Sequence, residues 1–385
     1  MVLKEASIVE MSDDKLELFI TRICMEMAKT ESLDLGFDQI VGYSKQVFYG
    51  IRGYGLLENL LLNPTINEIM VNDIDHIFIE EKGIIKQLKS KIESVEEYYR
   101  IINKIVSQSG REVNLANPIV DARLEENGAR VNVVLPPIAK DQPVLTIRKF
   151  PEKHIDMEYL TACGTISKQA ADFLKSLVQA KYNIMIGGGT SSGKTTFLNA
   201  LSEFIGQDER IITIEDSREL QLIGKSNLIS LETRNSNTSN RGAIGIKDLI
   251  KTSLRMRPDR IIVGEVRADE AVDMLMALNT GHDGGLTTAH ANSCKDMISR
   301  LETMVLRAGD NIPLEAVKRM IASSINIVIQ LSKLASNKRK LVEISELSFV
   351  DDRILINQLY LYNKKEDKLM PTGNKLIRRE KLHES

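Results

Sequence analysis

Tryptophan is absent from the 385-residue sequence, and cysteine is scarce, with only three copies. Cys24, Cys163 and Cys294 lie too far apart in the sequence to form a paired metal-binding motif, so we expect reduced thiols that mostly fill cores. Long hydrophobic runs are missing too, because no stretch reaches the ~20 apolar residues that a membrane-spanning helix needs. The acidic N-terminus also lacks the pattern of a signal peptide. We therefore expect a cytosolic protein that reaches a membrane only by docking.

Neither sign of charge dominates, because 51 Lys and Arg stand against 53 Asp and Glu, for a net charge of -2. This balance argues against a general polyanion binder, and we expect no direct contact with nucleic acid; a local basic patch is the alternative that stays open. A hydrophobic share of 43% is that of a soluble globular protein with real cores. At this length, two or three domains are expected.

The N-terminal part of the sequence divides into two regions. Residues 1–52 are predicted to form a small helical segment, because Leu16, Ile20, Ile23 and Met27 recur along one face of a helix. Residues 53–150 change to short β-branched runs around one helix-like stretch, which predicts an α+β domain with mainly antiparallel strands. The expected strands are 68–72, 76–80, 118–124, 129–135 and 143–150, the expected helix is 95–109, and a linker is expected at 151–165.

Residues 166–385 have the alternation of an α/β domain. A helix predicted over 167–181 is followed by short strands that alternate with helical stretches, which predicts a parallel sheet covered by helices. After Ile321 the pattern changes again, and we expect antiparallel strands that complete the sheet. The alternating strands are 183–186, 210–214, 260–264 and 286–291, and the later strands are 326–331, 340–347 and 353–362.

The stretch GGTSSGKT lies between the predicted strand 183–186 and a helix-ready run. Glycines let the backbone wrap so closely that several N–H groups point at phosphate oxygens, and the following helix adds its positive N-terminal end. Lys194 supplies a compact positive charge for the β- and γ-phosphates, and the Thr195 hydroxyl can complete the coordination of Mg²⁺. The competing interpretation is a glycine-rich turn that merely matches the pattern. The predicted nucleotide-binding residues are Gly188, Gly189, Thr190, Ser191, Ser192, Gly193, Lys194, Thr195 and Thr196.

Hydrolysis also needs acidic groups at the ends of neighbouring strands, to hold Mg²⁺ and to orient the attacking water. Glu215 and Asp216 end one predicted strand, and Glu265 ends another, directly after Gly264 at the position where P-loop proteins commonly carry an Asp. The predicted metal-side residues are therefore Thr195, Glu215 and Glu265, with Glu265 polarising the water. The competing interpretation is that these acids are surface carboxylates at strand ends, which are common.

Two of the five histidines, His282 and His290, occur in one glycine- and threonine-rich stretch, NTGHDGGLTTAHANS. Histidine can hydrogen-bond a γ-phosphate or a nearby water and report hydrolysis to the rest of the subunit. We therefore predict that both belong to the catalytic site. A structural role is the usual one for a lone histidine, and metal binding is the weaker interpretation, because no cysteine or third histidine lies close in sequence.

Four segments, GGTSSGKT, TIEDSREL, RPDRIIVGEVR and TGHDGGLTTAHANS, resemble in this order the Walker A, Asp box, Walker B and His box of the type II/IV secretion ATPases. The resemblance is closest to the branch that drives Tad/Flp pilus assembly, the CpaF-type ATPases, and extends from about Tyr54 to Leu347. It implies ATP and Mg²⁺ as ligands, a RecA-like C-terminal ATPase domain, a PAS-like N-terminal α+β domain and a homo-hexameric ring. The implied partner is an inner-membrane platform protein, with the ring docked at the cytoplasmic face of the membrane.

In that family, arginines from the N-terminal domain reach the phosphates when the domains close, and the matching positions here are Arg123, Arg130 and Arg148. A guanidinium that arrives only on closure stabilises the charge on the transferred phosphoryl group. Interdomain salt bridges or solvated side chains are the competing interpretation. Arg234 and Arg267 are expected, by the same resemblance, to line a subunit interface.

The sequence departs from the family at three points. Gly285 stands where a serine is usual in the His box, GYGLLE replaces the usual GPLE, and the tetracysteine motif of some type II secretion ATPases is absent. Two other functions stay open: a type IV secretion or conjugation ATPase on the same core, and a nucleotide-gated scaffold with little turnover. The missing Asp at Gly264 keeps the scaffold open, whereas Glu215, Glu265 and His290 argue against it.

Overall fold

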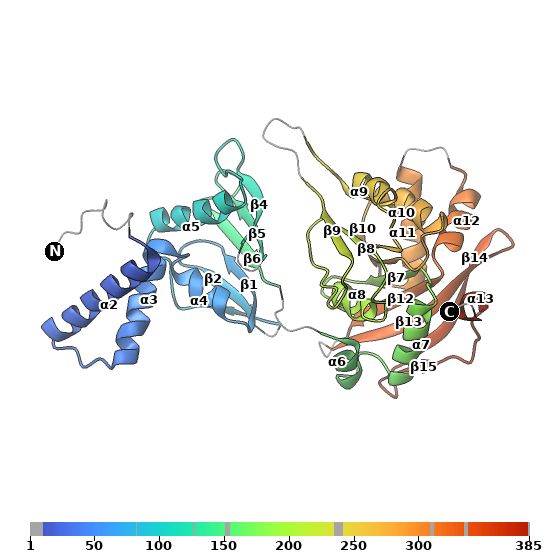
Figure 1. Ribbon diagram of the computed structural model, residues 1–385, viewed down its shortest axis with the longest axis horizontal. Helices are drawn as coiled ribbons and strands as arrows, with labels where there is room; N and C mark the ends of the chain where they lie inside the picture. Colours follow the sequence, from blue (N-terminus) through green and yellow to red (C-terminus); the bar gives the residue numbers. More distant parts are fainter. Residues whose placement is uncertain are drawn as a thin grey trace. The chain divides into compact units, whose positions relative to one another are not determined.

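The computed structural model describes residues 11–81, 83–125, 128–150, 155–234, 242–308, 312–334 and 338–383. The chain divides into two compact units, Met1–His154 and Ile155–Ser385, which can be followed by their colours in Figure 1. The finer division predicted from the sequence, with separate segments 1–52 and 53–150, stays a prediction. Among the described residues, no helix is long and apolar enough to cross a membrane.

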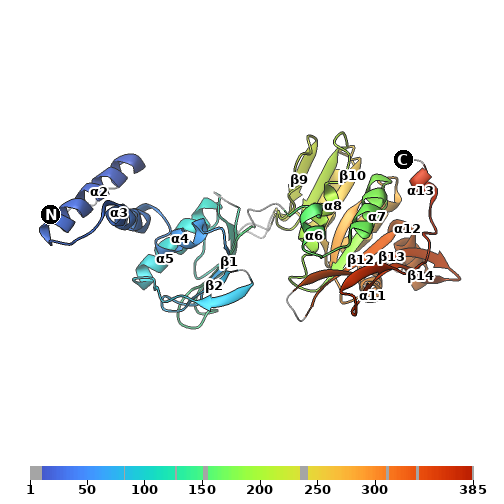
Figure 2. The ribbon, with the colours of Figure 1, turned by 90° about the horizontal axis from the view of Figure 1, so that it is seen from below.

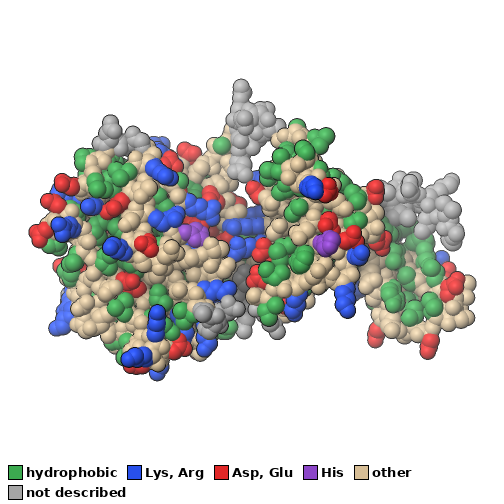
Figure 3. All heavy atoms as spheres, turned by 180° about the vertical axis from the view of Figure 1, so that it is seen from behind, with side chains coloured by type: hydrophobic (Ala, Val, Ile, Leu, Met, Phe, Trp, Pro, Cys, Tyr) green, Lys and Arg blue, Asp and Glu red, His purple; other side chains and the backbone are tan. Residues whose placement is uncertain are grey.

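Unit 1 begins with a helical hairpin formed by α2 (Asp13–Thr30) and α3 (Phe37–Arg52). Leu16 and Ile20 of the predicted apolar face are buried, but Met27 is 59% exposed, so the buried face of α2 passes through Ala28 instead. Figure 3 shows hydrophobic side chains gathered on the surface of this hairpin. Its exposed large apolar residues are Leu18, Met27, Leu33, Phe37, Tyr43, Val47 and Ile51.

The rest of unit 1 is a six-stranded antiparallel sheet in the order β3-β2-β1-β6-β5-β4. Its core is completed by α5 (Val95–Gln108), which begins at the Ser94 cap and buries Tyr98, Ile101 and Ile105. The sequence predicts this α+β arrangement but misses α4 (Leu56–Leu62), which lies in a continuous apolar run, and β3, which is exposed along its whole length. The strands are β1 (Ile66–Val71), β2 (Ile77–Glu81), β3 (Ile84–Gln87), β4 (Ile119–Arg123), β5 (Arg130–Val134) and β6 (Val144–Arg148).

Unit 2 is built on a nine-stranded sheet in the order β15-β14-β13-β12-β7-β11-β10-β8-β9. The parallel strands are β7 (Ile184–Gly188), β8 (Ile211–Glu215), β9 (Leu228–Glu232), β10 (Arg260–Val266), β11 (Leu286–His290) and β12 (Ile327–Lys333). The antiparallel strands are β13 (Arg339–Val350), β14 (Arg353–Asn363) and β15 (Lys368–Pro371). The prediction of antiparallel strands after Ile321 is confirmed for the pairing of β12 with β13 but not for its pairing with β7. α12 (Leu314–Ser324) returns β12 parallel to β7, as a crossover helix does. The sequence also did not predict β9.

Helices cover both faces of this sheet. One core contains α6 (Met157–Ala162), α7 (Lys168–Gln179) and α8 (Lys194–Ser202), which Figure 2 shows in front of the strands. The other core contains α9 (Ile246–Ser253), α10 (Glu270–Asn279), α11 (Cys294–Arg307) and α12, and a short helix, α13 (Glu380–His383), ends the described chain. Because α6 lies inside the predicted linker 151–165 and buries Met157 and Leu160, the second half of that range belongs to the packed unit.

Candidate functional site

The predicted nucleotide loop joins a central strand to a helix, because β7 ends at Gly188 and α8 begins at Lys194. Gly193 has a φ of 93°, a left-handed conformation that favours glycine, and Ser191 has a φ of 58°. A Cβ atom at Gly188 would overlap the Ser192 hydroxyl. The backbone therefore turns tightly onto the N-terminus of α8, where the helix N–H groups and the helix dipole favour an anion.

Lys194 is buried inside its own loop. Its ammonium group donates to the carbonyl oxygens of Gly188, at 3.2 Å, and Gly189, at 3.3 Å, and only 8% of the residue is exposed. Burial lowers the pKa of Lys194, and the negative charges of Glu265 and Glu219 oppose the shift. The loop thus holds a cation at its centre, in the place where a phosphate chain needs one.

His290 lies between this lysine and the carboxylate of Glu265. Its Nδ1 is 3.3 Å from Lys194 Nζ, and its Nε2 is 2.9 Å from Glu265 Oε1. Because an ammonium can only donate, Nδ1 must accept, which assigns the ring proton to Nε2, facing Glu265. Burial and the neighbouring Lys194 charge lower the pKa of His290, against the opposing effect of Glu265. The imidazole is therefore held neutral between a cation and an anion.

Glu265 is fixed from its other side by Arg267. The second carboxylate oxygen, Oε2, accepts from both Arg267 Nε, at 2.8 Å, and Arg267 Nη2, at 2.6 Å, two charge-assisted hydrogen bonds to one oxygen. Arg267 also lies 3.5 Å from Asp216. The structure therefore brings Lys194, His290, Glu265 and Arg267 together in one chain of contacts.

Glu215 is placed differently from the prediction of a carboxylate facing the nucleotide. It is 4% exposed, and its Oε1 accepts from the backbone N–H groups of Glu219, at 2.8 Å, and Leu220, at 2.9 Å. It is Glu219 whose carboxylate accepts from the Thr195 hydroxyl, at 3.1 Å. Glu219 was not predicted from the sequence, although TIEDSREL carries it four residues after Glu215.

Gly264 has a packing reason to lack a side chain. A Cβ atom there would lie 2.9 Å from Glu215 Cγ and 3.3 Å from its Oε1. The space that an Asp would occupy on β10 is therefore already taken by Glu215 of the neighbouring β8. The glycine at position 264, in place of the common Asp, therefore leaves room for the inward-pointing side chain of Glu215.

The structure does not bring His282 to the loop. His282 precedes β11, and β11 runs parallel to β7 from Leu286, opposite Ile184, to His290, opposite Gly188. At about 3.3 Å per residue, that strand alone separates its two ends by ~13 Å. His282 therefore lies towards the opposite edge of the sheet from His290.

Asn183 organises this opposite edge. Its side-chain oxygen accepts from the backbone N–H groups of Gly284, at 2.8 Å, and Gly285, at 2.9 Å. A Cβ at Gly285 would lie 3.2 Å from the Ile261 carbonyl and would overlap Leu278. The serine expected by resemblance would therefore meet packed side chains here, and its hydroxyl has no place at the nucleotide loop.

Three predicted arginines form one row across the sheet of unit 1. Arg123 pairs with Arg130 between β4 and β5, and Arg130 pairs with Arg148 between β5 and β6. Arg148 in turn pairs with Glu68 of β1. Burial raises the pKa of Glu68, and the positive charge of Arg148 opposes this shift without cancelling it. Like charges directly opposite one another destabilise a sheet, so the row is unfavourable for folding by itself. Arg234, which was expected at a subunit interface, donates to the Gly242 carbonyl at 2.8 Å.

The oxygen atoms around the loop suit a magnesium ion that is bound together with a nucleotide's phosphates. Among the described residues, no three His, Cys, Asp or Glu side chains lie close enough together to hold a metal ion by themselves. Mg²⁺ is usually bound through one or two carboxylates, several waters and substrate phosphate oxygens. The Thr195 hydroxyl and the Glu219 carboxylate that it touches are such a partial set.

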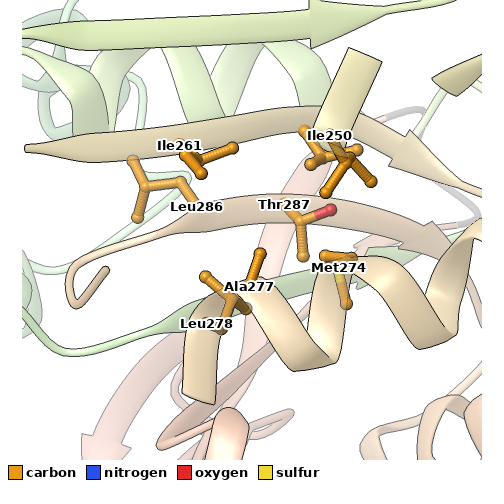
Figure 4. Close-up of a pocket in the computed structure, with 8 residues that line it drawn as sticks. Ile250, Ile261, Met274, Ala277, Leu278, Leu286 and Thr287 are labelled. Atoms are coloured by element: carbon orange, nitrogen blue, oxygen red, sulfur yellow. The ribbon is translucent and has the colours of Figure 1, made fainter. Parts of the chain in front are cut away.

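A small cavity elsewhere in unit 2 has a different character. It lies between β10, β11, α9 and α10, and Figure 4 shows its lining side chains pointing into it. The polar side-chain atom among them, Thr287 Oγ1, is buried and has no hydrogen-bond partner among the described residues. None of the predicted site residues lines this cavity, whose apolar walls do not suit a phosphate. The lining residues are Ile250, Ile261, Val263, Met274, Ala277, Leu278, Leu286 and Thr287.

This chain is similar to known proteins of secretion and conjugal transfer systems. The family model described as Type II/IV secretion system protein matches residues 52–376. A putative conjugal transfer protein of Mycobacterium tuberculosis is 30% identical over 325 residues, 83% of this chain and 92% of that protein. The type IV secretion system protein PtlH of Bordetella pertussis is 31% identical over 309 residues, 74% of this chain and 91% of that protein.

Solved structures share the fold. The crystal structure of the pilus retraction motor PilT with bound ADP matches with a TM-score of 0.56 and 20% identity, over 78% of this chain and 82% of that chain. The shared architecture is an N-terminal α+β domain followed by a RecA-like core, as the sequence predicted. The family match leaves out residues 1–51, which include nearly all of the α2–α3 hairpin.

Proposed function

Because the chain belongs to the type II/IV secretion system protein family, we propose that it is an ATP-hydrolysing motor of a pilus or secretion machine. The observation that carries this proposal is the line from Lys194 through His290 to Glu265, with separations of 3.3 Å and 2.9 Å. A cation inside the phosphate loop and a carboxylate one imidazole away are two of the charged groups that hydrolysis of a phosphoanhydride uses.

Each residue has a separate task in this proposal. The residues Gly188 to Thr196 surround the phosphates, and Lys194 exchanges its carbonyl partners for phosphate oxygens. Glu265, held by Arg267, orients the attacking water, and His290 hydrogen-bonds the γ-phosphate or that water through a ring nitrogen. Glu215 fixes the loop that carries Glu219, and its direct role as a metal ligand stays a prediction.

Mg²⁺, when bound with ATP, neutralises charge on the phosphate oxygens. Thr195 is the hydroxyl placed to complete its coordination, with Glu219 and Glu265 as the acids on that side of the loop. The arginine row of Arg123, Arg130 and Arg148 supplies further positive charge in the transition state, when the N-terminal unit closes over the nucleotide.

The same ATPase core would serve either of two systems, a pilus assembly system or a conjugation system. We propose assembly of a Tad/Flp pilus, through a homo-hexameric ring docked on an inner-membrane platform protein at the cytoplasmic face of the membrane. The relatives named as conjugal transfer and type IV secretion proteins support a conjugation or type IV secretion ATPase about equally. Deletion of the gene in its host separates them: loss of surface pili with normal conjugal transfer supports the pilus, and the reverse result supports conjugation.

Hydrolysis is tested by steady-state phosphate release from the full chain with ATP and Mg²⁺. We expect turnover in the wild type, a large loss in Glu265→Gln, and no ATP binding or hydrolysis in Lys194→Ala, while all three keep the same melting temperature. Equal, near-zero rates in the wild type and Glu265→Gln would leave only the nucleotide-gated scaffold. Normal turnover in Lys194→Ala would refute the assignment of the loop.

The ring is tested by mass measurement in solution, with and without a non-hydrolysable ATP analogue. A hexamer promoted by the analogue supports the motor, because ring closure couples neighbouring active sites. A monomer at micromolar concentration in both conditions would count against the ring.

A further inference from the structure

The hairpin of β12 and β13 reaches the nucleotide loop from a distant part of the sequence. Leu331 of β12 pairs with Gly188 at the end of β7, and Lys333, two residues further along, pairs with Arg339 at the start of β13. The first residue of β13 therefore lies beyond the end of β7, beside the loop that follows it.

Arg339 makes direct contact with that loop. Its Nε donates to the Ser191 carbonyl oxygen at 2.9 Å. Its side chain also passes against Gly193, where an added Cβ atom would lie 3.3 Å from Arg339 Cδ. Arg339 thus touches the loop on both sides of Ser192, immediately before Lys194.

The remaining donors of this guanidinium are not paired with any described carboxylate. Within the described part of the chain, no carboxylate lies within ion-pair distance of Arg339, whereas Arg260 is paired with Glu209 and Arg267 with Glu265. A guanidinium carries five N–H donors, and the contact with Ser191 uses one of them. Arg339 is also exposed, so its outer nitrogens are open to a ligand on the loop.

We propose that Arg339 is a second cation of the nucleotide site, which binds a phosphate oxygen of the bound nucleotide while its Nε holds the Ser191 carbonyl. This inference rests on the proposed function, because it assumes that the loop binds phosphates. The planar fork of arginine suits both contacts at once, since one edge can face the carbonyl and the other a phosphate oxygen.

Two substitutions separate charge from loop support. Arg339→Gln retains an N–H donor for the Ser191 carbonyl but removes the charge, whereas Arg339→Lys retains the charge on a side chain without the fork. Lys338→Ala is the matched control, because Lys338 is the adjacent exposed cation and, among the described residues, its side chain has no hydrogen bond or ion pair with the loop. Calorimetric titration of the full-length variants with ATP and Mg²⁺, and separately with inorganic tripolyphosphate, measures the affinity without requiring turnover.

We expect Arg339→Gln to weaken binding of both ATP and tripolyphosphate by about tenfold or more, the scale of one charge-assisted hydrogen bond. Arg339→Lys should lose less, and Lys338→Ala should bind both ligands as the wild type does. The melting temperatures of the free proteins check that each variant is folded.

Wild-type affinity in Arg339→Gln would overturn the proposal and leave Arg339 as a support of the loop only. Weakened binding of ATP with unchanged binding of tripolyphosphate would overturn the phosphate contact and point to the ribose or the base. If the wild type binds neither ligand, the proposed function itself fails. If the wild type binds both ligands and Arg339→Gln binds them equally well, only the proposal for Arg339 fails.

Discussion

The ring nitrogen Nδ1 of His290 lies 3.3 Å from the ammonium nitrogen of Lys194. This pair requires a neutral imidazole, because a protonated ring has no lone pair to accept with and would face a second cation. The contact between Lys194 and His290 therefore depends on the absence of a proton from Nδ1 of His290. A phosphate that draws Lys194 away would also release His290.

The first prediction concerns the pH at which His290 titrates. Burial and Lys194 lower its pKa below the ordinary value of 6.5, so in the folded protein it stays neutral at pH values where the unfolded chain has already bound a proton. Stability from this group is therefore complete above pH 6.5 and falls as the pH decreases from 6.5 towards the lowered pKa. Histidine NMR of the nucleotide-free protein should show a midpoint below 6.5 for the signal that disappears in His290→Asn. A midpoint above 6.5 would contradict the pairing with Lys194.

The second prediction concerns Gly264. The added methyl group of Gly264→Ala would lie 2.9 Å from Glu215 Cγ, so Glu215 must move and release the Glu219 and Leu220 amides. Overpacking of this kind costs about 1–3 kcal/mol, and we expect lower stability together with lower ATP turnover. Chemical denaturation and phosphate release measure both effects. Gly42→Ala is the control, because a Cβ there has nothing within 4 Å and alanine suits the interior of α3, so its stability should not fall. A Gly264→Ala variant as stable as the wild type would contradict the close approach.

The nucleotide loop was predictable because its chemistry lies in one contiguous stretch, where strand, glycines, lysine and helix follow in order. Glu265 was predictable for a similar reason, since acids at the carboxyl ends of parallel strands gather at one edge of a sheet. Glu219 was not, because its approach to Thr195 depends on Glu215 turning inward and holding the loop. The hydrogen bonds from the Glu219 and Leu220 amides to Glu215 leave no pattern in the sequence from which they could be predicted.

Strand order accounts for the other differences. His282 and His290 are close in the sequence, but β11 runs between them and places them towards opposite ends. Arg339 is far from the loop in the sequence, yet β12 returns beside β7 and brings it into contact. The direction of β12 could not be inferred from its composition, because parallel and antiparallel strands in a buried sheet share the same apolar pattern.

The third prediction concerns Glu270, which holds the backbone that carries Arg267. Its buried Oε1 accepts from the N–H groups of Arg267, at 2.6 Å, and Ala268, at 3.0 Å. We expect Glu270→Ala to lower kcat by about tenfold with KM changed less than about twofold, because Glu265 loses its orientation while the loop is intact. Glu270→Gln should recover part of the loss, since its amide oxygen can still accept.

Asp273→Ala is the matched control for this experiment. Asp273 lies on the same helix and is ion-paired with Lys247 and Lys251, away from the candidate site. Steady-state kinetics of both variants should show a loss of kcat in Glu270→Ala only. The double variant with Arg267→Ala should be no slower than Arg267→Ala alone, because both changes act through one side chain. Additive losses, or equal losses in the control, would show that Glu270 merely stabilises the fold.

The fourth prediction concerns the arginine row of unit 1. Arg130 stands in the middle of the row, with Arg123 and Arg148 directly opposite it on the two neighbouring strands. If these charges reach the phosphates only when the units close, they act mainly on the transition state. Arg130→Ala should then lower kcat by at least about tenfold while the equilibrium affinity for ATP changes less than about threefold. Lys86→Ala, which removes an exposed cation of the same sheet that is paired with Glu81, is the control. An unchanged kcat in Arg130→Ala would remove the N-terminal unit from the chemistry, and a matching loss of affinity would place the arginine in ground-state binding instead.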